Sequence, residues 1–425
     1  MNERALAGAG ARIRWQWAIA VLAFAASITA SQAEPRVLGL NEALQLALRS
    51  DAIVPAIRSR VRGAEAGIRQ ADRLPNPTIG AEFENFAGSG SYRGSSRIQS
   101  TVFLQQLLEL GGKREARTGV AQAELKIARA RGAVRVLDLL RDVELAWIDL
   151  AVAIAQQRIA EERLSIAQRL RDEFVRRSQS GRDPLFTQSR AEAQVALEEI
   201  AVEQAASAAQ IARANLASYW RGNTDFTIDI SLLEAEQQHH RNNAYNVEIA
   251  LLQSEKELAA ARTVLERARA IPDPSLRLGV RRFTETGDSA AIAGISIPLP
   301  LFDNNDGNIE KAEADRRAVE LEIETATRAM RRELSRLEGR LRANAAEARR
   351  IQSDVIPRAQ RAVDLIRDGL ERGVFSYVEF ADAQRTLNDA RLRRIDALKS
   401  FQQDNAALAR LTGRHMRLNM KVPPQ

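Results

Sequence analysis

Side chains suited to binding a metal ion are scarce in this sequence. The chain has no cysteine and three histidines, which are His239, His240 and His415. An adjacent histidine pair can contribute to a metal site, but such sites need three or four ligands at characteristic spacings, and no such spacing surrounds these residues. The sequence therefore favours ordinary surface or packing histidines and predicts neither a metal site nor a cofactor.

Carboxylates could supply a second kind of chemistry. Glu379 and Asp382 are three residues apart, which places both on one face of a helix. No nucleophile, base and orienting group come together in the sequence, so we expect no enzymatic activity. An acidic pair alone is typical of a solvated helix face, and its meaning depends on the elements that carry it.

The first 33 residues predict a secretory signal peptide. A basic region with Arg4, Arg12 and Arg14 precedes the apolar stretch 15–28, and 31–33 has the small residues of a cleavage site. Roughly 14 apolar residues are too few for a bilayer-spanning helix, which needs about 20; an uncleaved anchor is the alternative.

The mature chain has only a small, diffuse positive charge. Removal of residues 1–33 takes away three arginines and one glutamate, so that 62 basic and 55 acidic side chains become 59 and 54, a net charge of +5. This diffuse charge argues against nucleic-acid binding.

Several signals recur at a nearly constant offset, which indicates an internal duplication. The matching positions lie 191 to 197 residues apart and are Gly181 with Gly373, Gly222 with Gly413, and Pro75-Asn76-Pro77 with Pro272-Asp273-Pro274. We expect a first repeat over 34–222, a mixed linker over 223–240, a second repeat over 241–415 and a tail over 416–425. Thr187 and Arg190 then correspond to Glu379 and Asp382, and Arg190 could pair with a tip acid.

Each repeat predicts very long helices and one short β-hairpin. Apolar residues at steps of three and four indicate helices, and the expected ones are 40–73 with a break or kink at Pro55, 112–179, 185–219, 241–270, 308–368 and 376–411. Tips join the long helices at 180–185 and 369–377. Alternating stretches predict hairpins over 76–106 and 274–299. The turn residues that bound these hairpins are Pro75, Pro77, Gly111, Gly112, Pro272 and Pro274.

The hairpins need partners outside the chain. Leu276, Leu278 and Val280 alternate with residues of a polar face, among them Arg277 and Arg281. No second apolar stretch approaches the length of a spanning helix, so a membrane crossing would use strands, which enter lipid only as a closed barrel. The smallest bacterial barrels have about eight strands, so four per chain require several chains, and three would supply twelve. A soluble β-domain that caps a coiled coil is the alternative.

These features together resemble the TolC-type outer-membrane efflux family over residues 38–415. The resemblance rests on the tandem repeat, the hairpins, Pro75-Asn76-Pro77 and the tips at Gly181 and Gly373. The stretches 108–114 (LELGGKR) and 298–308 (PLPLFDNNDGN) are similar to the heavy-metal branch, the outer components of cobalt–zinc–cadmium and nickel efflux systems.

The resemblance implies a mainly α fold with a small β part. Three chains would form a trans-subunit, twelve-stranded β-barrel in the outer membrane, continuous with an α-barrel of long helices in the periplasm. This homotrimer would be a passive duct that docks on a periplasmic adaptor and an inner-membrane, proton-driven pump of the RND type, and it would export heavy-metal cations. A duct for drugs, organic solutes or type I secretion is an alternative, and a periplasmic coiled-coil scaffold or adaptor is another.

The resemblance also gives roles to particular residues. In the family's motif, two acids line the closed periplasmic entrance, and Glu379 and Asp382 match them, although the first is glutamate here rather than aspartate. The tips would contact the adaptor, and the residues expected there are Ser180, Gly181, Leu185, Gly373 and Ser376. Ordinary turn chemistry explains the glycines and caps equally well.

Overall fold

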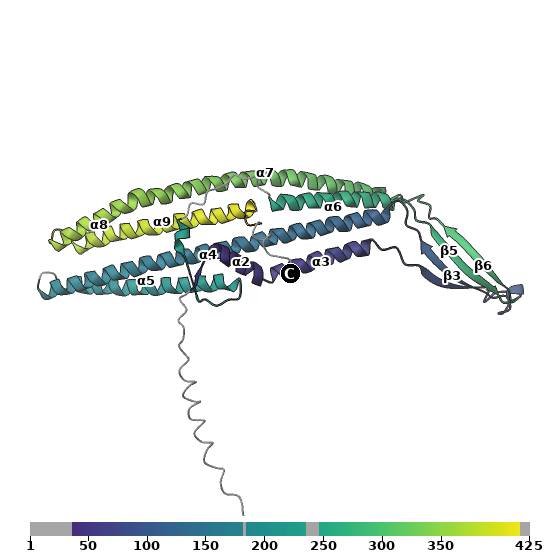
Figure 1. Cartoon of the computed structure of the whole chain (residues 1–425), viewed down its shortest axis with the longest axis horizontal. Coiled ribbons are helices and arrows are strands. Elements are labelled where there is room, and N and C mark those ends of the chain that lie inside the picture. Colours follow the sequence, from purple (N-terminus) through teal and green to yellow (C-terminus); the bar gives the residue numbers. More distant parts are fainter. Residues whose placement is uncertain (1–35, 182–183, 235–245, 417–425) are drawn as a thin grey trace, which may run out of the picture.

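The structure is a computed structural model that describes residues 36–181, 184–234 and 246–416. Its helices lie side by side in one elongated body, and a four-stranded sheet extends from one end (Figure 1). The predicted fold class, a mainly helical chain with a small β part, is confirmed.

The helices of the first half are α2 (Leu40–Ser50), α3 (Ile53–Ala71), α4 (Lys113–Gln179) and α5 (Leu185–Ser218). The helix expected over 40–73 breaks at Asp51, whose Oδ1 accepts a hydrogen bond from the Ile53 N–H (2.7 Å). Pro55 then lies in the first turn of α3, where its missing N–H is harmless. With 67 residues, α4 spans about 100 Å at 1.5 Å per residue.

The second half contains α6 (Val247–Arg269), α7 (Asp306–Arg350), α8 (Ile356–Glu371) and α9 (Tyr377–Leu411). The uninterrupted helix predicted over 308–368 is wrong in one respect, because a π turn, Ile351–Val355, separates α7 from α8. Pro357 follows this turn, and a proline has no N–H and crowds the carbonyl four residues before it. A wider turn relieves that conflict.

The sheet is fully antiparallel, with the order β2 (Thr78–Glu84), β3 (Gln99–Leu107), β5 (Ser275–Phe283) and β6 (Ser289–Ser296). The pairing of β3 with β5 joins one hairpin from each half of the chain. Strands β2 and β6 form the two edges, and neither edge meets another strand within the described residues of one chain.

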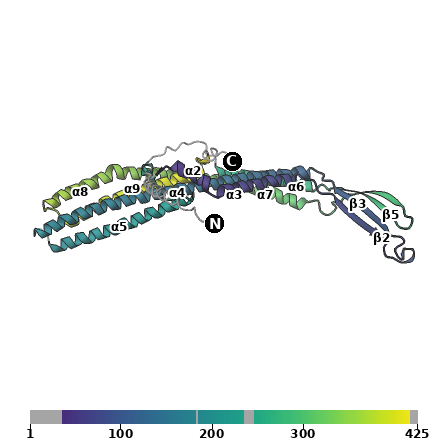
Figure 2. The same ribbon diagram turned by 60° about the horizontal axis from the view of Figure 1, so that its bottom comes forward.

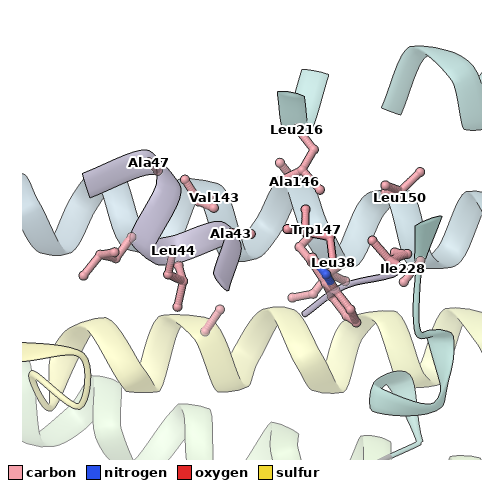
Figure 3. Close-up of a cluster of buried hydrophobic side chains, with 14 of the residues drawn as sticks. Leu38, Ala43, Leu44, Ala47, Val143, Ala146, Trp147, Leu150, Leu216 and Ile228 are labelled. Atoms are coloured by element: carbon pink, nitrogen blue, oxygen red, sulfur yellow. The ribbon is translucent and has the colours of Figure 1, made fainter. Parts of the chain in front are cut away.

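The main hydrophobic cluster lies at the middle of α4, where Leu140, Val143 and Leu150 are fully buried. Figure 3 shows α2 and the end of α5 packed on α4 here, with Leu44 and Leu216 directed into the cluster. Two short parallel strands, β1 (Arg36–Leu38) and β4 (Phe226–Ile228), pack on the same region. The described part of the expected linker 223–240 therefore helps to cover this core.

None of the helices in the described part of the chain has an apolar stretch long enough to cross a bilayer.

Candidate functional site

The α4–α5 and α8–α9 pairs end together at the extremity opposite the sheet, as Figure 2 shows. Among the described residues, polar and aromatic contacts join the two tips. The Arg177 guanidinium donates a hydrogen bond to the Leu370 carbonyl (3.0 Å). The rings of Phe174 and Tyr377 meet edge to face with 5.1 Å between centroids, and the Arg190 guanidinium lies 5.4 Å from the Tyr377 centroid. Arg190 therefore contacts an aromatic ring, and the expected pairing with a tip acid is absent from the described structure.

Tyr377 is half-buried among these neighbours. Burial raises the pKa of its hydroxyl, while the nearby Arg190 acts in the opposite direction and has a smaller effect. The side chain is consequently neutral at physiological pH, and its ring packs between the two tips.

The second tip has a compact, well-defined turn. Gly373 adopts φ = 75°, and the N–H groups of Val374 and Gly373 donate to the carbonyls of Gly369 (2.8 Å) and Leu370 (3.1 Å), which is a Schellman motif. The Phe375 ring covers Gly369, where an added Cβ would lie 2.2 Å from a ring carbon.

Helix α9 begins with a capping box. The Glu379 carboxylate accepts a hydrogen bond from the Ser376 N–H (2.7 Å), and the Ser376 side chain accepts one from the backbone of Glu379. Asp382 lies one turn further along. Both acids are exposed, and neither has an ion-pair partner among the described residues. Their spacing correctly predicts that both acids lie on one helix face; the capping role of Glu379 was not predicted, although the pattern Ser376-x-x-Glu379 signals it.

Both tips expose apolar side chains. Leu185, the first residue of α5, is 76% exposed, and Val374 in the second tip is 71% exposed. Ser180 and Gly181, with φ = 72°, close the first turn, where the Ser180 hydroxyl donates to the Arg177 carbonyl (2.9 Å).

The joint between sheet and helices contains most of the 108–114 stretch (LELGGKR), and its contacts explain that motif. The N–H groups of Leu108 and Leu110 donate to the Pro274 carbonyl (2.9 Å) and to Asp273 Oδ1 (2.8 Å). Lys113 forms an ion pair with the same Asp273 carboxylate (2.7 Å). Gly111 and Gly112 follow each other with φ = 68° and 70°, and a Cβ on Gly111 would lie 2.5 Å from the Ile271 side chain. Pro272-x-Pro274, which directly precedes β5, is thus part of this joint, and Pro75-x-Pro77 directly precedes β2.

The sheet has one apolar face, as the alternation in the sequence predicts. Cross-strand pairing brings Ile79, Leu104 and Leu278 into one row, and Val102 and Val280 into the next row on the same face. All five side chains are more than half exposed in the single chain. So large an exposed apolar surface marks a contact with lipid or protein.

No group of three or more metal-binding side chains lies together within 36–181, 184–234 and 246–416. His415 is buried, and its Nε2 lies 3.0 Å from Glu144 Oε2, so it ties the end of the second half to the middle of α4. His239 and His240 lie outside the described residues.

Known proteins match this chain over nearly its whole length. The profile of the family described as "Outer membrane efflux protein" matches residues 43–221 and 241–414. The chain is 29% identical over 387 residues to the cobalt-zinc-cadmium resistance protein CzcC of Cupriavidus metallidurans, covering 89% of this chain and 90% of the relative. It is 29% identical over 304 residues to the nickel-cobalt-cadmium resistance protein NccC of Alcaligenes xylosoxydans, covering 70% and 68%. The solved outer membrane protein VceC of Vibrio cholerae shares the fold, with a TM-score of 0.71, 19% identity, and coverage of 88% and 96%.

Proposed function

Because the chain belongs to the outer membrane efflux protein family, we propose that it is the outer-membrane duct of a tripartite, proton-driven efflux system of the RND type that exports heavy-metal cations. Its relatives CzcC and NccC are resistance proteins for cobalt, zinc, cadmium and nickel, which supports this class of substrate. The duct is passive and docks on a periplasmic adaptor that connects it to the inner-membrane pump.

The observation that carries this proposal is the incomplete sheet. In water, a sheet with two unpaired edge strands and an exposed apolar face is a site of aggregation, so this sheet needs further partners. In lipid, every backbone N–H and C=O group needs a partner, so the edges must be closed. Three copies close them when β6 of each chain pairs with β2 of the next, which gives twelve strands with the apolar face towards the lipid.

The same symmetry gathers the tips around an axis. Three copies would bring six carboxylates, from Glu379 and Asp382, to the periplasmic entrance of the duct. The exposure of both acids and their lack of an ion-pair partner within the described residues support this role. A ring of carboxylates attracts cations and sets which ions pass.

The docking surface is the exposed end of the two tips. Leu185 and Val374 present apolar groups beside Ser180, Gly181, Gly373 and Ser376, which suits contact with the tip of another helical hairpin. The chain contains no cysteine, so one placed at Ser180 or Ser376 is the only thiol. We expect each to form a disulfide with a matching cysteine in the adaptor, whereas a cysteine at the mid-helix position Glu199 should form none. Equal trapping at all three positions, or at none, would exclude tip-to-tip docking.

The duct is tested by localisation, assembly and phenotype. We expect the mature protein in detergent extracts of the outer membrane, as a heat-dissociable trimer that conducts ions in planar bilayers. Loss of its gene should lower tolerance to Co²⁺, Zn²⁺, Cd²⁺ or Ni²⁺, and a plasmid copy should restore it. Release as a water-soluble monomer would refute the duct. A loss of tolerance to organic compounds alone would refute the metal substrate and favour a drug or solute duct.

A further inference from the structure

The polar face of the sheet carries a stacked group of side chains. The Phe103 ring lies over Gly80, its cross-strand partner, where an added Cβ would come within 2.4 Å of the ring. The Arg277 guanidinium stacks on this ring, 3.4 Å from its centroid, and forms an ion pair with Glu82 (2.5 Å). The aromatic ring and the carboxylate together fix the position of the arginine.

A second arginine on this face is held in a similar way. Arg281 donates from Nε to the Thr101 hydroxyl (2.9 Å) and from Nη1 to the Gln99 side-chain oxygen (3.1 Å). Its Nη2 lies 2.7 Å from Glu84 Oε2. Thr101, 1% exposed, is covered by this arrangement.

The charges on this face balance residue by residue. By the alternation of each strand, its charged members within β2, β3, β5 and β6 are Glu82, Glu84, Arg277 and Arg281. Each arginine has its own carboxylate within 2.7 Å. That separation is far below the Debye length of about 8 Å at physiological salt, so an ion passing along this face meets neutral pairs in place of isolated positive charges.

We propose that Glu82 and Glu84 determine the charge selectivity of the sheet-lined part of the duct, because they neutralise two arginines that would otherwise repel the exported cations. This inference rests on the proposed function, since it takes the polar face of three chains to line the lumen. Without the two carboxylates, three copies would present six uncompensated arginines, and a ring of arginines makes a pore favour anions. Exposed ion pairs contribute little to the stability of a fold. Stability therefore explains these two pairs poorly, whereas a role in charge selectivity accounts for them.

The test measures the chloride-to-potassium permeability ratio of the intact trimer in planar bilayers under a KCl gradient. In the variant E82Q/E84Q we expect this ratio to rise about fivefold. The reciprocal variant R277Q/R281Q should lower it. The control is E199Q, which removes an exposed acid of α5, an element that does not contact the sheet in Figure 1, and should leave the ratio unchanged.

The outcomes separate the two proposals. Normal conductance with an unchanged permeability ratio in both strand variants would overturn the selectivity role and leave the duct intact. Absence of any channel in the native protein would instead overturn the proposed function. If E82Q/E84Q did not assemble, R277Q/R281Q would decide, because a ratio that failed to fall would refute the compensation of these arginines.

Discussion

Glu379 combines two tasks that different substitutions separate. Its carboxylate accepts a hydrogen bond from the Ser376 N–H at the start of α9 (2.7 Å), and in the trimer it would contribute charge to the entrance. Glutamine keeps an acceptor for this N–H, as capping boxes allow, whereas alanine removes both the acceptor and the charge. Loss of a cap costs about 1 kcal/mol, which corresponds to a roughly fivefold faster amide hydrogen exchange in the first turn of α9 for E379A and little change for E379Q.

The electrostatic task should respond differently. In the proposed trimer, both E379A and E379Q would remove three of the six carboxylates at the proposed entrance, and unit charges 4 Å apart in water interact by about 1 kcal/mol. We therefore expect block of the conductance by Co²⁺ to weaken at least about fivefold in both variants, and further when D382N is added. E199Q, which removes an exposed acid from the middle of α5, should leave the block unchanged. If Co²⁺ blocked the conductance of E379Q as strongly as that of the native protein, and blocked E379A less, the cap and not the charge would control the entrance.

Two further substitutions test the packing and the electrostatics of the chain. In G80A the new methyl group meets the Phe103 ring, so the trimer should lose about 1–3 kcal/mol of stability and dissociate at a lower temperature, whereas G294A, with its nearest neighbour 4.0 Å away, should behave like the native protein. Burial raises the pKa of Asp404 despite its ion pair with Arg340 (3.0 Å). The folded protein then holds the carboxyl proton of Asp404 more tightly than the unfolded chain does. The stability of the native protein relative to D404N should therefore rise as pH falls from 7 towards about 4, the ordinary range of Asp. Thermal unfolding followed by circular dichroism measures this difference in stability, and a difference that stayed constant with pH would contradict the prediction.

The sequence predicted the features that local patterns encode. Apolar steps of three and four gave the long helices, and alternation in β5 separated Leu276, Leu278 and Val280 from Arg277 and Arg281. The contact of Phe174 with Tyr377 joins residues 203 positions apart, and no periodicity connects them. The π turn at Ile351–Val355 lies in a stretch whose apolar spacing stays helical, so only Pro357 hinted at it.

The sequence predicted where the residues of the candidate site lie on their helix or strand, but it did not predict which side chains they contact. Three-residue spacing put Glu379 and Asp382 on one face of α9, yet it could not reveal that Arg190 turns towards Tyr377. Likewise, the sequence showed that Arg277 lies on the polar face of its strand, but its partner Glu82 is 195 residues away. Such pairings depend on the register of β2, β3 and β5, which the folded sheet fixes.

The sheet and the tips, at opposite ends of the elongated molecule, differ in whether their carboxylates are paired with cationic side chains. This contrast fits a duct for cations. At the sheet, each carboxylate of the polar face is bound to an arginine within 2.7 Å. At the tip, Glu379 and Asp382 have no cationic partner in the described structure, so their charge remains available to a passing ion. In the proposed duct, an acidic entrance would raise the local concentration of cations, and a neutral exit would give them no site at which to bind. A tight site anywhere along the path would slow release, which is why a conduit for metal ions needs attraction at one end and charge compensation at the other.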